Sequence, residues 1–248
     1  MSAAIQGQCL ARQNARYWVL AFGLLLILAL VSPVSAESPS EMGSSVLFGM
    51  ETEPLAGAAV SEKWNHAKAE IARELDIVAR CHRTGACPAA ARKLIDLSAA
   101  GAGRDSRAKI GLINRAVDQA ISPVSDDAPW GVPDRWSAPF ETLRSSRGDC
   151  EDYAIVKYLA LIEAGIPRDD LKIVILKNAF PREDHAVVAV RVDEQWLILD
   201  NRTLTLVRDV DLMRATPEFV LDQAGVRRFV SRGRNRASPF GLRVARSG

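Results

Sequence analysis

The spacing of apolar residues changes once along the 248-residue chain, and this change is the feature that most limits its fold. Before residue 165, apolar side chains recur at helical spacing in four segments: 61–81, 88–101, 105–122 and 150–164. After it come four short β-rich runs: 171–178, 185–192, 195–201 and 204–210. Tight turns separate the last three runs. Helices followed by such runs predict an α+β fold with an antiparallel sheet.

The first 36 residues have the features of a secretory signal peptide. Arg12 and Arg16 precede an unbroken apolar run at 17–31, and small residues at 34–36 match a cleavage pattern. The run is shorter than the ~20 apolar residues that a membrane span needs, although an uncleaved N-terminal anchor is an alternative. In either case we expect residues 37–248 to be exported, with no transmembrane span in the mature chain.

Composition divides the exported part into three segments. Residues 37–60 are rich in Ser, Gly, Pro and Ala and are interpreted as a linker or loosely docked lead-in, ahead of a domain at 61–226. Residues 227–248 hold seven arginines and no acidic residue. This basic tail is interpreted as a solvated end, with contact to anionic lipid or an acidic partner as the alternative. We expect no nucleic-acid partner, since residues 37–226 carry 23 basic and 30 acidic residues.

Export changes the interpretation of the four cysteines. Cys81 and Cys87 bracket a short Gly-containing loop, and an oxidising compartment favours a disulfide between them over two free thiols. Cys9 would leave with the signal peptide. Cys150 is then the odd cysteine in an exported protein, which makes it a candidate reactive thiol.

Three carboxylates surround this thiol at the predicted start of a helix. Cys150 lies between Asp149 and Glu151, with Asp152 next. A helix N-terminus lowers the pKa of a thiol and favours the nucleophilic thiolate, whereas nearby negative charge disfavours it. The charge of the acids must therefore be offset if Cys150 is to react.

A histidine and an aspartate are candidates for the partners of the thiol. His185 opens one β-rich run, and Asp200 closes the next. The turn at 193–194 should bring both to the same end of a hairpin, where Asp200 can hold the imidazole in one tautomer. Taken singly, each residue is more often structural, but the order Cys–His–Asp favours a catalytic triad.

Three stretches resemble the bacterial transglutaminase-like cysteine proteinase family, over roughly residues 110–205. They are WGVPDRWSAPFETL, RGDCEDYAIVKYLALIEAGIP and DHAVVAVRVDEQWLILDN. The resemblance implies a papain/transglutaminase-like fold, in which N-terminal helices precede an antiparallel sheet that packs on the helix carrying the thiol. It also implies Cys150 as nucleophile, His185 as general base and then acid, and Asp200 as the orienting residue.

The resemblance further implies calcium beside the thiol. Asp149, Glu151 and Asp152 match the family's acidic motif, and Ca²⁺ prefers several carboxylate oxygens. A bound cation would cancel the charge of the acids around Cys150. Asp134 is the first candidate for a further ligand, with Asp126 and Asp127 after it. The alternative is that these acids only cap the helix or complement its dipole.

The function implied is that of a calcium-dependent periplasmic cysteine endopeptidase. Members of the family cut the N-terminal region of a large surface adhesin near paired alanines, which releases cells from a biofilm. An inner-membrane cyclic di-GMP receptor sequesters them. We expect peptide hydrolysis through a thioester, with backbone N–H groups near Cys150 in the oxyanion hole. Trp136 is a weaker donor candidate that more plausibly packs as an aromatic. A transglutaminase-like acyl transferase and a non-catalytic binding module are the alternatives.

Overall fold

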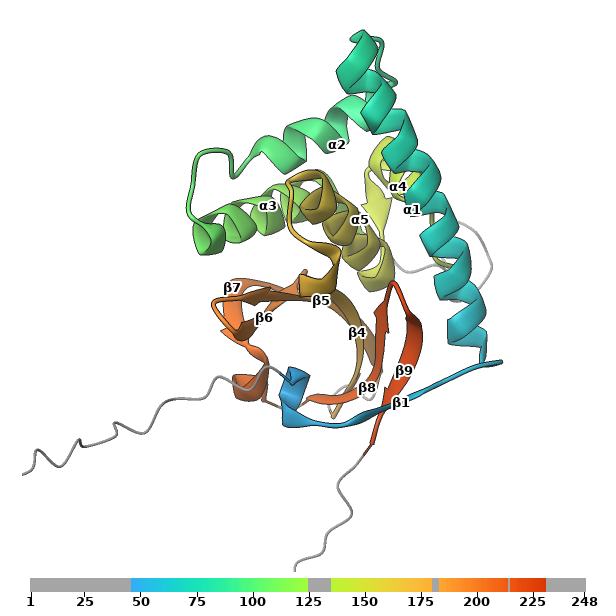
Figure 1. Cartoon of the computed structure of the whole chain (residues 1–248), viewed down its shortest axis with the longest axis vertical. Helices are drawn as coiled ribbons and strands as arrows, with labels where there is room; N and C mark the ends of the chain where they lie inside the picture. Colours follow the sequence, from blue (N-terminus) through green and yellow to red (C-terminus); the bar gives the residue numbers. More distant parts are fainter. Residues whose placement is uncertain (1–45, 125–134, 180–182, 214, 231–248) are drawn as a thin grey trace, which may run out of the picture. The chain divides into compact units, whose positions relative to one another are not determined.

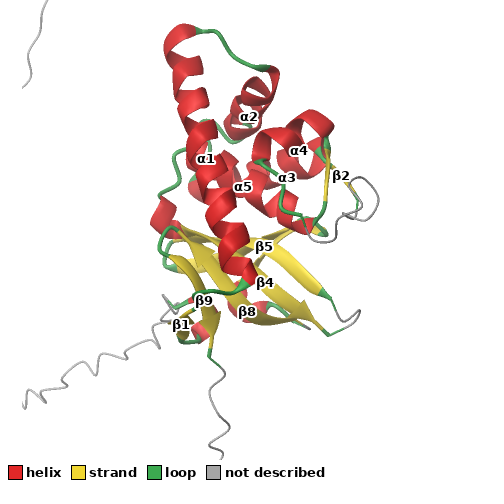
Figure 2. Ribbon diagram, turned by 90° about the vertical axis from the view of Figure 1, so that its right-hand side faces the viewer, coloured by secondary structure: helices red, strands yellow, loops and turns green. Residues whose placement is uncertain are grey.

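Helices cover one face of a curled antiparallel sheet in the computed structural model (Figure 1, Figure 2). The structure describes residues 46–124, 135–179, 183–213 and 215–230. The helices are α1 (Ala59–Thr84), α2 (Ala89–Ala99), α3 (Ser106–Ala120), α4 (Pro139–Ser145) and α5 (Cys150–Glu163). The predicted α+β architecture is confirmed.

Seven of the described strands form the sheet, in the spatial order β1-β9-β8-β4-β5-β6-β7. They are β1 (Thr52–Pro54), β4 (Leu171–Asn178), β5 (Asp184–Val192), β6 (Gln195–Asp200), β7 (Thr203–Arg208), β8 (Ala215–Asp222) and β9 (Gly225–Phe229). All neighbouring strands are antiparallel. A separate parallel pair, β2 (Ser122–Pro123) and β3 (Arg147–Gly148), lies just before α5 in the chain. Short 3₁₀ turns occur at Leu47–Gly49, Arg168–Asp170 and Asp209–Asp211.

Helix α5 lies at the centre of the fold. Every residue from 152 to 161 is buried, and the helix packs against α1 to α4 on one side and β4 and β5 on the other. A helix that is apolar all round is buried on all sides. The ring of Tyr158 meets that of Trp64 edge-on, with centroids 5.7 Å apart, and Trp64 Nε1–H donates to the Asp222 carbonyl at 2.8 Å. These contacts fix α5 between α1 and the sheet.

Two elements differ from the sequence prediction for identifiable reasons. Helix α4 lies outside the four helical segments predicted above, in a proline-rich stretch, and its first residue is Pro139. Proline is favoured there because the first helical N–H needs no partner. Strand β8 contains Pro217 beside a register shift opposite Ile175 and Leu176, and such irregularities accommodate proline in a strand.

Residues 37–60 were interpreted as a linker or loosely docked lead-in, and their described part, from residue 46, is docked on the sheet. Leu47 is buried, and β1 pairs with β9. The ring of Phe48 packs edge-on against Phe229, with centroids 5.6 Å apart, and the Phe48 N–H donates to the carboxylate of Asp209. The segment therefore belongs to the sheet and to the apolar cluster on the sheet face opposite the helices.

The other terminal predictions fall mostly outside the described residues. The predicted signal peptide, 1–36, lies wholly outside them. The predicted basic tail overlaps β9, so Arg227 and Arg228 are strand residues, while 231–248 are not described. None of the helices in the described part of the chain has the length and apolar character of a membrane span.

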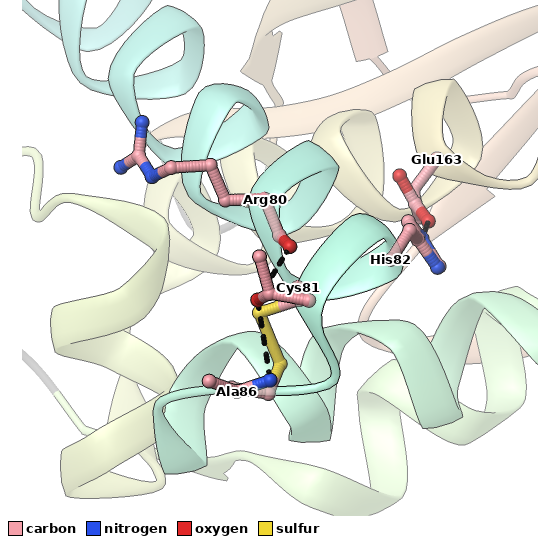
Figure 3. Close-up of a disulfide and its surroundings, with 7 residues drawn as sticks. Arg80, Cys81, His82, Ala86 and Glu163 are labelled. Carbon is pink, nitrogen blue, oxygen red and sulfur yellow. Dashed lines mark hydrogen bonds and ion pairs between the residues drawn. A yellow bond between two sulfur atoms is a disulfide. The ribbon is translucent and has the colours of Figure 1, made fainter.

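The predicted disulfide is confirmed between Cys81 and Cys87, at the end of α1 (Figure 3). Within the loop that it closes, Thr84 Oγ1 donates to the Arg80 carbonyl and accepts from the Ala86 N–H. Gly85 ends α1 in the left-handed conformation that glycine favours. The bridge thus fixes the turn from α1 into α2.

Helix α4 receives its N-terminal cap from another helix. Ala138 at the N-cap position has no side-chain oxygen, and the Phe140 N–H instead donates to both carboxylate oxygens of Glu74, at 3.0 and 3.1 Å. Glu74 belongs to α1 and is 6% exposed. Burial raises the pKa of Glu74 from its ordinary 4.5 to about 7, despite the opposing effect of the Phe140 hydrogen bond.

This raised pKa predicts a pH-dependent effect of replacing Glu74. The folded protein binds this proton more tightly than the unfolded chain, so Glu74 lowers stability progressively as the pH rises from about 4.5 to about 7. We expect Glu74→Gln to become more stable relative to wild type by about 3 kcal/mol across that window. Urea unfolding at pH 4.5 and pH 8 measures the difference. Glu62→Gln, an exposed substitution on the same helix, controls for the lost charge. A difference in free energy of unfolding between Glu74→Gln and wild type that does not change with pH contradicts the raised pKa of Glu74.

Candidate active site

The start of α5 is set by the residues around Cys150. Asp149 is the N-cap: its backbone is extended and its side chain accepts from the Asp152 N–H at 3.3 Å. Gly148 precedes it, where an added Cβ would lie 2.7 Å from the Asp152 Cβ and 2.9 Å from its Oδ2. Glycine is therefore needed at 148 to let the Asp152 side chain approach. Cys150 follows as the first helical residue.

Asp152 has a structural partner. Its side chain is 2% exposed, and Oδ1 accepts a hydrogen bond from the Ser137 N–H at 2.8 Å. The bond ties the segment before α4 to the first turn of α5. Of the acids expected to bind calcium, Asp152 is thus turned into the protein interior.

His185 and Asp200 are brought together at the same end of the β5–β6 hairpin. His185 Nε2 lies 2.8 Å from Asp200 Oδ1, which also accepts from the Arg202 N–H at 2.9 Å. Burial raises the pKa of Asp200, but the hydrogen bond and charge of His185 outweigh it, so the pKa is lower than usual. The imidazole is 2% exposed, and its Nδ1 has no hydrogen-bond partner among the described residues. With Nε2–H donating to Asp200, Nδ1 is the ring atom that can accept a proton.

The thiol lies beside the strand that carries this histidine. The backbone N–H of Ala186, the residue after His185, acts to lower the pKa of the Cys150 thiol. The thiol proton is donated to Glu151 Oε2 at 2.9 Å. Burial first, then the charge and hydrogen bond of Glu151 and the charge of Asp149, raise the pKa of the thiol far above its ordinary value. Burial and the two carboxylates thus favour the protonated thiol.

The described residues do not by themselves form a calcium site, although two of the acids are of a kind that binds Ca²⁺. Asp149 and Glu151 flank the thiol at the start of the helix, and their oxygens suit Ca²⁺. Within the described ranges, no group of three or more His, Cys, Asp or Glu side chains is arranged to hold a metal ion. Asp134, with Asp126 and Asp127, lies outside those ranges. Asp149 and Glu151 therefore fit as two ligands of a site that needs further donors.

Trp136 and the other two histidines of the chain have structural environments. Trp136 is 9% exposed within the helix-side core, and Lys63 Nζ lies 5.9 Å from its ring centroid, so it packs as an aromatic. His66 is exposed on α1. His82 lies 2.6 Å from Glu163 at the far end of α5 (Figure 3).

Sequence reasoning missed a buried charge pair next to this site. Lys157, on the otherwise apolar α5, lies 2.7 Å from Asp118 of α3. The signal was present in the sequence, because Lys157 interrupts the apolar run YAIVKYLAL. A charged residue within a helix that is buried on all sides requires a partner.

A thiol at a helix start, beside a histidine–aspartate pair on the adjoining sheet, is the arrangement of papain-like cysteine proteases and transglutaminases. The sequence matches the bacterial transglutaminase-like cysteine proteinase family over residues 78–225. The chain belongs to this family, and it is a cysteine protease by that membership.

Two solved structures of LapG from Legionella pneumophila are similar in fold. The calcium-bound structure has a TM-score of 0.50 at 19% identity, covering 69% of this chain and 93% of that chain. The EGTA-treated structure has a TM-score of 0.50 at 19% identity, covering 72% and 88%. No curated protein matches the sequence.

The hydrogen bond of Asp152 predicts that this acid acts in folding and not in calcium binding. We expect Asp152→Ala to lower the free energy of unfolding by about 1–3 kcal/mol in EGTA, because the Ser137 N–H loses its acceptor. Any rise in melting temperature on adding calcium should persist in this variant. Glu151→Gln is the matched comparison, in which that rise should shrink. Loss of the calcium response in Asp152→Ala alone would make Asp152 a ligand instead.

Proposed function

We propose that this cysteine protease acts as an endopeptidase with Cys150, His185 and Asp200 as its catalytic triad. One observation carries the proposal: the His185–Asp200 hydrogen bond leaves Nδ1 as a buried proton acceptor, on the strand that packs against the helix of the thiol. The alternative of a non-catalytic binding module does not explain why the histidine–aspartate pair lies on this strand. Asp200 orients the imidazole and favours its protonated form.

The chemistry follows from these groups. For reaction, the Cys150 thiol turns from Glu151 to His185 and gives its proton to Nδ1. The thiolate attacks the peptide carbonyl, and the tetrahedral oxyanion is held by backbone N–H groups at the start of α5. The imidazolium then protonates the leaving amine, and a thioester remains. Water, deprotonated by His185, hydrolyses the thioester and regenerates the thiol.

We further propose that Ca²⁺ is held by Asp149 and Glu151 with additional oxygen ligands. Two facts support this: the acids at the thiol fit a cation, and the related LapG has been solved in calcium-bound and EGTA-treated forms. The ion would supply positive charge against the carboxylates that hold the thiol protonated. Glu151 would then no longer compete for the thiol proton.

The proposed substrate is the N-terminal region of a large surface adhesin, cut near paired alanines in the periplasm to release cells from a biofilm. The family supports this choice, and the signal-like N-terminus supports export. The Cys81–Cys87 disulfide also fits an oxidising compartment. An inner-membrane cyclic di-GMP receptor is the proposed regulator.

The triad predicts the behaviour of a single variant. We expect Cys150→Ala to lose cleavage of a purified adhesin N-terminal fragment by at least about 10⁴-fold while retaining the wild-type melting temperature, because no nucleophile remains. Cleavage is followed by gel electrophoresis and mass spectrometry. Undiminished cleavage by Cys150→Ala would end the proposal. Adding an amine donor separates hydrolysis from acyl transfer, since an amide product marks a transferase.

The calcium proposal predicts that EGTA stops cleavage and that added Ca²⁺ restores it. Glu151→Gln should need more calcium for half-maximal activity, because one ligand charge is lost. Melting temperature with and without calcium gives a readout that does not depend on activity. Full activity in EGTA, with no calcium-dependent change in melting temperature, would exclude the metal.

A further inference from the structure

The two strands that carry the histidine and the aspartate of the triad are not paired along their whole length. Pairing between β5 and β6 runs from the hairpin turn to Val188, which lies opposite Leu199. His185 precedes Val188 by three residues, so it lies beyond the last paired position of the two strands. Strand pairing between β5 and β6 therefore does not by itself fix the meeting of His185 and Asp200.

Beyond that point each strand is paired with its other neighbour. The start of β5 is paired with β4 as far as Asp184, and the Glu183 carbonyl accepts a hydrogen bond from the Asn178 N–H at 3.0 Å. The end of β6 is paired with β7, where Asp200 lies opposite Thr203. The histidine and the aspartate thus belong to two different strand pairs at this end of the sheet, β4–β5 and β6–β7.

Side chains join the two strand pairs at this end. One connection is the hydrogen bond between His185 Nε2 and Asp200 Oδ1, at 2.8 Å. A second is an ion pair: the guanidinium of Arg202, in the turn after β6, lies 2.6 Å from Glu183 Oε1, just before β5. Arg202 takes part in both connections, since its backbone N–H donates to Asp200 Oδ1 at 2.9 Å. A displacement of Arg202 would therefore move the acceptor that holds the imidazole.

The Glu183–Arg202 ion pair is expected to add little to overall stability. Its side chains are 40% and 45% exposed, and exposed ion pairs contribute little to the free energy of unfolding. Its position, however, gives it a local effect. Glu183 is two residues before His185, and Arg202 is two residues after Asp200. The ion pair therefore restrains the two strands directly beside the triad residues that they carry.

We propose that Glu183 and Arg202 are positioning residues of the active site. Their ion pair holds the turn after β6 against the start of β5, and so keeps Asp200 Oδ1 within hydrogen-bond distance of His185 Nε2. The imidazole is then held with Nδ1 free to accept the thiol proton. This inference rests on the triad proposed above, and it assigns the ion pair a role in the reaction that a surface salt bridge would not have.

The experiment observes the imidazole of His185 directly. The probe is the set of ring ¹⁵N and N–H signals of ¹⁵N-histidine-labelled protein; the chain has three histidines, and His66→Gln and His82→Gln assign the other two. In Arg202→Gln, which keeps the backbone N–H, exchange of His185 Nε2–H with water should be about two- to fivefold faster, because Asp200 is less restrained. An exchange rate equal to that of wild type overturns the inference.

A second variant removes the same ion pair from its other side. Glu183→Gln should have the same effect as Arg202→Gln, and it covers the case in which Arg202→Gln does not fold. Because each single variant loses the same interaction, the double variant should have the same exchange rate as either one. Effects that multiply in the double variant overturn the inference. Circular dichroism verifies the fold of each variant.

The matched control is an exposed ion pair elsewhere in the same sheet. Arg228 lies 2.7 Å from Glu53, the residue opposite it where β9 pairs with β1. Arg228→Gln removes a charge of the same kind and should leave the His185 signal unchanged. An equal change in Arg228→Gln would make the effect a general result of lost charge and would overturn the positioning role.

Kinetics separate this inference from the function on which it rests. In Arg202→Gln and in Glu183→Gln, kcat for the adhesin fragment should fall by about two- to fivefold with KM little changed, while Arg228→Gln keeps the wild-type kcat. The NMR measurement needs no substrate. An unchanged His185 signal in an enzyme that Cys150→Ala inactivates refutes the positioning role alone, whereas undiminished cleavage by Cys150→Ala refutes the triad.

Discussion

The structure depends on the burial of a single helix. Since α5 is enclosed from residue 152 to residue 161, its axis and register are fixed by the core, and so is the position of its first residue. That residue is Cys150, and β5 is one of the strands that pack against its helix. The core thereby fixes the position of the thiol. Active sites built on helices or strands are held more precisely than sites on loops.

Three acidic side chains lie close together around the thiol, and each makes a different hydrogen bond. Asp149 caps the helix, Asp152 binds the Ser137 N–H, and Glu151 accepts the thiol proton. The three carboxylates look alike in the motif but point in different directions. Asp149 and Glu151 flank the thiol, whereas Asp152 is bound within the fold, so one short sequence holds acids in different environments.

Local patterns were enough to predict the helices α1, α2, α3 and α5 and the strands β4 to β7, because each is defined by its own periodicity and turns. The position of the hairpin turn at 193–194 likewise predicts that His185 and Asp200 lie close together. Features that depend on distant partners were missed. The cap of α4 comes from Glu74, 66 residues before Phe140, and Pro217 concealed β8 because its irregular register is set by β4.

The pairing of β1 with β9 joins the two ends of the described fold. Thr52 lies opposite Phe229, and Arg227 reaches back to the Thr52 side chain and carbonyl. The sheet cannot be completed until its last strand has been made, after nearly all of the described chain. Contacts between such distant residues form slowly. Completion of the sheet is thus expected to be a late step in the folding of this chain.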